Sequence, residues 1–213
     1  MSSRSALLKR RSPNRAPKPE IIVVCEGKVT EPQYFRDFRA LSANSLVTVT
    51  AIGGCGVPVS VVERAIEVKQ QREIAAKRSK DSFDLYFEVW AVFDRDSHPD
   101  GQVPRAFSLA EKHGVLIAYS NPCFEVWGLM HYLCYGRPGH HHECQAELKR
   151  QLSGFCHEKN PVMDVKALSK TYTDAVRNAE KALKDREEER SPQGDPSTGV
   201  FRLTEQVRKH GKA

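Results

Sequence analysis

Residues 21–35 read IIVVCEGKVTEPQYF. The stretch begins with five consecutive apolar residues, most of them β-branched, which is typical of a strand that is buried on both faces. An acidic residue and a glycine end this apolar run. A helix then begins at Thr30 or Glu31, because the following Pro32 is favoured in the first turn of a helix. The stretch therefore predicts a buried strand, a short polar loop and a helix.

The same alternation of strand and helix continues along the chain. Further strands are predicted at 46–52, 85–93 and 115–119. Helices are predicted at about 58–79, 104–113, 124–133, 144–152 and 164–189, followed by a last helix that Ser197 or Thr198 caps. Strands that alternate with helices form a parallel sheet with right-handed crossovers. We therefore expect an α/β fold with an open, mainly parallel sheet flanked by helices and a C-terminal helical extension.

Charge and composition divide the 213 residues into three parts. Residues 1–19 hold six basic residues and no acid, with several prolines and serines, which favours a disordered basic arm. Residues 20–135 form the expected catalytic core, and residues 136–213 form a mainly helical region packed on it. Outside the arm, 33 − 6 leaves 27 basic residues against 27 acidic ones, so the body is formally neutral. The arm either neutralises nucleic-acid phosphates or is a solvated leader without a specific role.

The apolar residues argue for a protein of the cytoplasm. No apolar run approaches the roughly 20 residues of a membrane helix, and the N-terminus lacks a signal-peptide core, so no membrane partner is expected. The six cysteines form no C-x-x-C pair. In a chain of this length without a secretory signal, we interpret them as reduced thiols.

Polar residues follow three of the predicted strands where each strand ends. Glu26 follows the first strand, Asp94 and Asp96 follow the third, and Ser120 follows the fourth. The carboxyl ends of parallel strands lie along one edge of a sheet, where ligands bind. Carboxylate oxygens are preferred ligands of Mg²⁺, and Glu31 supplies another carboxylate close to Glu26. These four acids are the predicted metal site, against the alternative of surface acids in turns and helix caps.

Four further residues are candidates for contacts with substrate or with the metal ligands. Lys28 lies between the two glutamates and could stabilise transition-state charge, or it is a solvated lysine. His98 follows the aspartates and could contact a phosphate or a leaving group. Asn121 and Glu125 either orient a phosphate and support the metal, or are only the start signal of a helix.

A second group of metal-ligand residue types occupies the stretch from His140 to Cys144, which reads HHHEC. Cys134, Cys156 and His157 lie around it in the sequence. Zinc is one interpretation, but the spacing matches no zinc finger, and adjacent histidines rarely converge on one ion. Surface histidines or a loop that faces phosphate are the favoured interpretation.

Four strings of the sequence together resemble the RloB family. They are VCEGKVTEPQYF at 24–35, VFDRDSH at 92–98, YSNPCFEVWGLMHY at 119–132 and DPSTGVFRL at 195–203. The acid–glycine pair after the first strand and the Asp-x-Asp after a later strand also resemble the Toprim catalytic domain of topoisomerases, primases and OLD-type nucleases. The resemblance extends from about residue 21 to 207.

The resemblance implies a Toprim-like fold and a Mg²⁺- or Mn²⁺-dependent nuclease with Glu26, Asp94 and Asp96 as its acidic core. Glu31 matches the second acid of OLD-type nucleases, with a spacing one residue longer. RloB-like proteins are associated with bacterial defence against phage, including abortive infection, and are commonly encoded beside an ATPase. The implied partners are therefore a nucleic acid, which is DNA or an RNA such as tRNA, and an ATPase of the AAA or ABC type.

Two other hypotheses remain open from the sequence. The chain could be a non-catalytic or ATPase-regulated subunit that binds nucleic acid through its basic arm, because the Gly-rich turn at 53–56 lacks the GK[ST] ending of an ATP-binding loop. It could instead transfer phosphate with Asp94 as a nucleophile. Self-association into a homo-oligomer is also left open.

Overall fold

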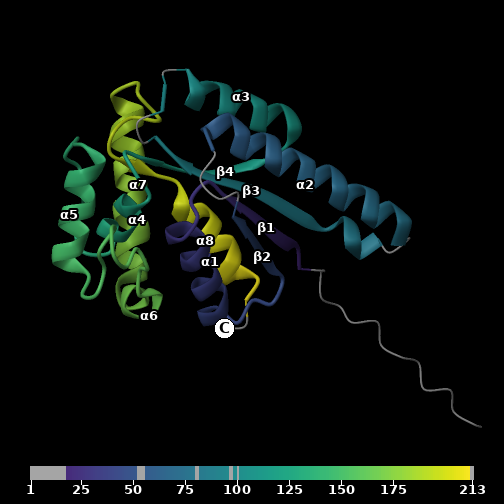
Figure 1. Cartoon of the computed structure of the whole chain (residues 1–213), viewed down its shortest axis with the longest axis horizontal. Coiled ribbons are helices and arrows are strands. Elements are labelled where there is room, and N and C mark those ends of the chain that lie inside the picture. Colours follow the sequence, from purple (N-terminus) through teal and green to yellow (C-terminus); the bar gives the residue numbers. More distant parts are fainter. Residues whose placement is uncertain (1–17, 52–55, 80–81, 96–97, 100, 212–213) are drawn as a thin grey trace, which may run out of the picture.

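The computed structural model describes residues 18–51, 56–79, 82–95, 98–99 and 101–211. Their centre is a five-stranded sheet in the order β2-β1-β3-β4-β5 (Figure 1). The strands are β1 Glu20–Cys25, β2 Val47–Ala51, β3 Phe87–Asp94, β4 Leu116–Asn121 and β5 Ser197–Thr198. The first four strands are parallel to one another, and β5 is antiparallel to β4. The expected α/β fold with an open, mainly parallel sheet is confirmed.

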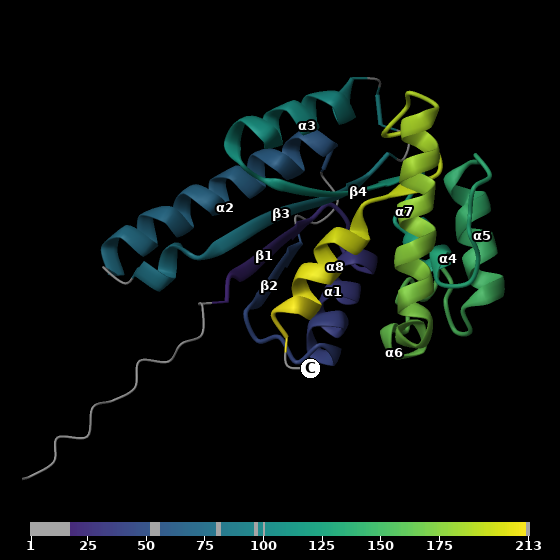
Figure 2. The same cartoon turned by 180° about the vertical axis from the view of Figure 1, so that it is seen from behind.

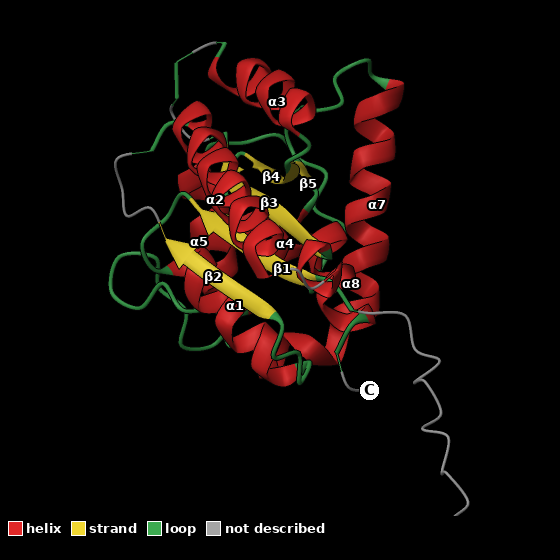
Figure 3. Ribbon diagram, turned by 90° about the vertical axis from the view of Figure 1, so that its right-hand side faces the viewer, coloured by secondary structure: helices red, strands yellow, loops and turns green. Residues whose placement is uncertain are grey.

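Helices cover both faces of this sheet. They are α1 Thr30–Leu41, α2 Pro58–Ser79, α3 Gln102–His113, α4 Glu125–Met130, α5 His141–Gln151, α6 Val165–Leu168, α7 Tyr172–Glu188 and α8 Val200–Lys209. Short 3₁₀ helices occupy Ser82–Leu85 and Ser169–Thr171. Figures 1 and 2 show α2 and α3 on one side of the sheet and α1 and α8 on the other. Seen from the side, α7 runs along the edge of the molecule beside β5 (Figure 3).

The alternation of side chains along β1 builds two separate apolar cores. Ile22 and Val24 face α2 and α3 in one core, whereas Ile21 and Val23 belong to the other. Both sets are buried, which explains why the strand is continuously apolar instead of alternating with polar residues. The core on the side of α1 also includes apolar residues of α4, α5, α7 and α8.

The C-terminal helices attach to the sheet through α4. All six residues of α4 are buried, including Trp127 and Gly128. A side chain at Gly128 would lie 2.8 Å from Leu148 of α5, so the glycine permits a close approach of the two helices. Helices from residues 136–213 therefore share one apolar core with the N-terminal strands.

Several predicted boundaries were wrong. Leu85 lies in a 3₁₀ helix and is 54% exposed, and β3 begins two residues later. The single helix predicted at 164–189 is three consecutive segments, namely α6, a 3₁₀ turn and α7. The N-cap residue of the last helix is Gly199, but Thr198 Oγ1 accepts a hydrogen bond of 3.3 Å from Val200 N, the first residue of α8. Ser197 and Thr198 also form β5, because they pair with the end of β4.

The predicted basic arm falls almost entirely on residues 1–17, which lie outside the described part of the chain. Just after it, Lys18 Nζ donates hydrogen bonds to the carbonyl oxygens of His210 and Gly211, at 2.7 and 3.0 Å. The entry to β1 is thereby tied to the end of α8. Among the described residues, no helix combines the length and the apolar character that crossing a membrane requires.

Replacing Tyr34 with phenylalanine tests the contact between α1 and α4. Trp127 Nε1 donates a hydrogen bond of 2.7 Å to Tyr34 OH, and both side chains are fully buried. Tyr34→Phe leaves the indole N–H without this acceptor, so the free energy of unfolding should fall by about 1–3 kcal/mol. Urea denaturation followed by circular dichroism measures the change. Tyr132→Phe, at a side chain that is 39% exposed, is the control and should alter stability little; equal midpoints for both variants would contradict the prediction.

Candidate active site at the carboxyl edge of the sheet

The candidate site lies where the chain reverses the direction in which it adds strands. β1 has β2 on one side and β3 on the other, so the switch point is between β1 and β3. In open α/β sheets, a switch point opens a crevice at the carboxyl ends of the strands. Cys25 pairs with Val92, and Glu26 N donates a hydrogen bond of 3.0 Å to Val92 O. The pairing of β1 with β3 therefore places Glu26 and Asp94 side by side at this crevice.

The side chains of these two acids share a small polar cluster. Asp94 N donates a hydrogen bond of 3.4 Å to Glu26 Oε2, and His98 Nε2 lies 2.8 Å from Glu26 Oε1. Asp94 Oδ2 accepts a hydrogen bond of 3.2 Å from Phe124 N, which follows β4. Ligand atoms of Glu26, Asp94 and His98 all lie within 4.8 Å of one another. Asp96 lies outside the described residues, so its metal-binding role stays a prediction.

Glu31 is a buried carboxylate in the first turn of α1. The Gly27 and Glu31 backbone N–H groups donate hydrogen bonds to it, and only 7% of the residue is exposed. A Cβ at position 27 would lie 2.0 Å from Glu31 Oε2, so the loop can approach the carboxylate only with glycine there. Burial, together with the charge of Glu125, raises the pKa of Glu31 to about 7 in spite of these hydrogen bonds.

A second buried carboxylate comes from α4. Glu125 is 3% exposed, and its Oε1 lies 2.7 Å from Nδ1 of His157, whose side chain is 46% exposed. His157 belongs to the segment between α5 and α6. The contact therefore joins the helix after β4 to the C-terminal part of the chain.

One cavity of about 520 Å³ contains all these groups. Its described lining includes four carboxylates, four histidines and one lysine, which are Glu26, Glu31, Asp94, Glu125, His98, His141, His142, His157 and Lys28. A cavity of this size is within the usual range of small-ligand sites. Four carboxylates against one lysine make it acidic, and like charges at such distances repel one another unless protons or cations neutralise them.

Asn121 is not brought to this cavity. It is the last residue of β4, and its Nδ2 donates a hydrogen bond of 2.8 Å to Gln193 O. It lines a separate cavity of about 220 Å³. It also does not cap the following helix, because the residue before α4 is Phe124. Lys28 does line the acidic cavity, and it is exposed to solvent.

The histidine stretch holds its three side chains close together, although adjacent histidines rarely converge on one ion. One ligand atom from each of His140, His141 and His142 lies within 4.8 Å of the others. Cys144 is separate from them, because it is buried and its thiol contacts Tyr135 OH at 3.3 Å. A hydrogen bond with Cys144, together with burial, raises the pKa of Cys123 well above its usual value, so Cys123 is not an activated nucleophile.

Sequence reasoning missed the part that the C-terminal region contributes to the cavity. His157 had been considered only as part of a zinc cluster, because nothing near it in the sequence points to Glu125. The two residues are 32 positions apart and meet only through the packing of α5 against α4. His141 and His142 at the start of α5 reach the same cavity in this way.

The donor set of the strand edge fits a hard divalent cation. Glu26 and Asp94 offer carboxylate oxygens within one cluster, and a cation there would relieve the repulsion among the acids. His98 adds a nitrogen donor, which Mn²⁺ accepts beside carboxylates more readily than Mg²⁺ does. The residues present therefore fit the predicted Mg²⁺ or Mn²⁺.

The raised pKa of Glu31 predicts a pH-dependent stability in metal-free buffer. The folded state keeps the Glu31 proton up to about pH 7, whereas the unfolded state releases it near its ordinary pKa of 4.5. The Glu31 contribution therefore decreases as pH rises from about 4.5 to 7, by on the order of 3 kcal/mol. Glu31→Gln should remove this decrease, as chemical denaturation at pH 5 and pH 8 measures. Glu67→Gln on the exposed face of α2 is the control; parallel pH curves for wild type and Glu31→Gln would refute the prediction.

No curated protein and no solved structure matches this chain. The family model described as RloB-like protein matches residues 21–207, which include every strand and helix up to most of α8. This chain therefore belongs to the RloB-like protein family.

Proposed function

We propose that this protein is a Mg²⁺- or Mn²⁺-dependent nuclease that cleaves phosphodiester bonds of DNA or RNA. The observation that carries the proposal is the convergence of Glu26, Glu31, Asp94 and Glu125 on one cavity at a switch point of a parallel sheet. The resemblance to Toprim domains and OLD-type nucleases supports the same activity. A polyanionic substrate can approach such an acidic cavity only when cations neutralise it.

The acidic residues would have two roles, which are to hold a cation and to move a proton. Glu26 and Asp94 would hold the cation, with Asp96 and Glu31 as further carboxylates. When bound, the cation supplies polarisation of the phosphodiester and a more acidic water. Glu26 either remains a ligand or accepts a proton from the attacking water as a general base. Lys28, which is exposed at the rim, would contact the nucleic-acid phosphates.

Amide substitutions of the acidic pair test the activity. Glu26→Gln and Asp94→Asn should each lower cleavage by at least about a hundredfold, because they remove charge at the reacting phosphate. The assay follows labelled DNA and total tRNA with Mg²⁺ and with Mn²⁺, for the chain alone and with the proposed partner ATPase. Glu67→Gln is the matched control. Wild-type cleavage rates in either site variant would contradict the assignment.

Cation binding can be measured without any substrate. Mn²⁺ or Mg²⁺ at a hundred times its dissociation constant should stabilise the folded protein by about 2.7 kcal/mol, because only the folded state gathers the carboxylates. Thermal unfolding with increasing cation concentration measures this gain. The gain should be lost in Asp94→Asn and kept in Glu67→Gln. Equal stabilisation of all three proteins would place the cation elsewhere.

We further propose that the nuclease is the effector of a bacterial anti-phage defence system that acts with a partner ATPase. The support is membership of the RloB-like family together with the resemblance of the four sequence strings. The alternative is a non-catalytic or ATPase-regulated subunit that binds nucleic acid through its basic arm. The two differ in the cleavage assay, because only the nuclease depends on Glu26 and Asp94.

A further inference from the structure

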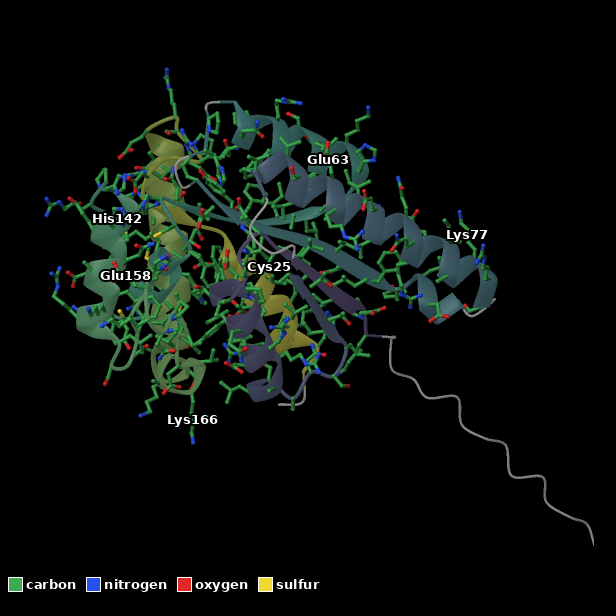
Figure 4. The ribbon with its side chains drawn as sticks, in the orientation of Figure 1. Cys25, Glu63, Lys77, His142, Glu158 and Lys166 are labelled. Carbon is green, nitrogen blue, oxygen red and sulfur yellow. The ribbon has the colours of Figure 1, made fainter. Side chains whose placement is uncertain are left out.

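The cavity has two walls that come from different parts of the chain. The wall at the strand edge carries Glu26, Asp94 and His98. The other wall carries His141 and His142 of α5 and His157 of the segment after it, and all three line the cavity. In Figure 4, His142 and Glu158 lie on the same side of the molecule, with Cys25 at the end of β1 nearer its middle. The proposed nuclease function assigns no chemical role to the histidines of the second wall.

The second wall contains an oriented imidazole. Glu125 is 3% exposed, and a carboxylate that is so far removed from water requires a hydrogen-bond partner. The His157 Nδ1 atom lies 2.7 Å from Glu125 Oε1, so the carboxylate fixes both the orientation and the tautomer of the ring. A proton passed to a substrate would then leave from Nε2. The His157 side chain is 46% exposed, which leaves it accessible to a ligand in the cavity.

Departure of an alkoxide in phosphodiester cleavage is assisted by a proton donated on the side opposite the attacking water. In an in-line displacement, the attacking and leaving oxygens lie on opposite sides of phosphorus. An acidic cluster that serves the attacking water at the strand edge therefore leaves the departing oxygen to the other wall.

We propose that His157 is the general acid of the cleavage step and that Glu125 is its positioning residue. This inference rests on the proposed nuclease function. The oxygen of water forms a bond to phosphorus and its proton passes to the Glu26 carboxylate or to solvent, as the bond from phosphorus to the leaving oxygen breaks. Protonated His157 gives the proton on Nε2 to that oxygen, so the product leaves as an alcohol, and neutral His157 regains a proton from solvent.

His157→Asn separates acid catalysis from positioning. The asparagine amide can still donate a hydrogen bond to Glu125 in place of Nδ1, but it has no proton to give to a leaving group. Two substrates are compared with Mn²⁺, namely a labelled DNA or tRNA and bis(4-nitrophenyl) phosphate, whose leaving group departs without protonation. His157→Asn should lower the rate on nucleic acid by about a hundredfold or more and change the rate on the nitrophenyl ester by less than about threefold. His113→Asn at the end of α3, outside the cavity, is the control.

The possible negative results distinguish the role of His157 from the nuclease activity itself. Equal losses on both substrates, or no loss on nucleic acid, would overturn the role of His157 while leaving the nuclease intact. A wild-type protein that cleaves neither substrate, under any cation, would refute the nuclease itself.

A measurement on the metal-free protein supplies a readout that is independent of activity. Nitrogen-15 NMR of the imidazole rings, assigned with His157→Asn, should show neutral His157 protonated at Nδ1, as the Glu125 contact requires. A ring protonated at Nε2 alone would overturn the proposed orientation.

Discussion

The parallel pairing of β1 with β3 is the constraint on which the site depends. The register places Cys25 opposite Val92, so the residues that follow both strands emerge side by side. Two segments 68 residues apart in the sequence thereby bring Glu26 and the Asp94 backbone within 3.4 Å. No local preference of either segment could achieve this. The two apolar cores, one on each face of the sheet, hold the register that makes the acidic cluster.

Gathering carboxylates in this way opposes folding, and the structure offsets the cost with identifiable contacts. Glu31 accepts hydrogen bonds from backbone N–H groups, and its raised pKa reflects burial beside Glu125. Asp94 accepts a hydrogen bond from Phe124 N, and Glu26 and Glu125 each contact a histidine. The clustered negative charges lower the free energy of unfolding. Such a loss of stability is typical of a functional site, where a bound cation or substrate would supply the missing partners.

The sequence was most informative where burial is continuous. The apolar runs of β1 and β3 and the polar residues that end them predicted the parallel sheet and the edge that holds Glu26 and Asp94. It was least informative where a two-residue strand or a loop takes its conformation from neighbours. Ser197 and Thr198 carry a helix-capping pattern, and Thr198 Oγ1 accepts a hydrogen bond from Val200 N, but the two residues also pair with β4 as β5, which their sequence does not indicate. Asn121 likewise has the residue type of a cap, but its amide is held by Gln193 O.

The second wall of the cavity likewise depends on contacts between segments that are far apart in the sequence. The sequence predicts that residues 136–213 are a mainly helical region packed on the catalytic core. Their apolar residues share one apolar core with the strands, with Leu148 of α5 against Gly128 of α4. This packing carries the start of α5 and His157 to the cavity, and Glu125 of α4 meets His157 there. The sheet edge alone would provide ligands for the proposed cation on one side of a substrate. Because the helical region closes the other side, it belongs to the site as much as the strands do.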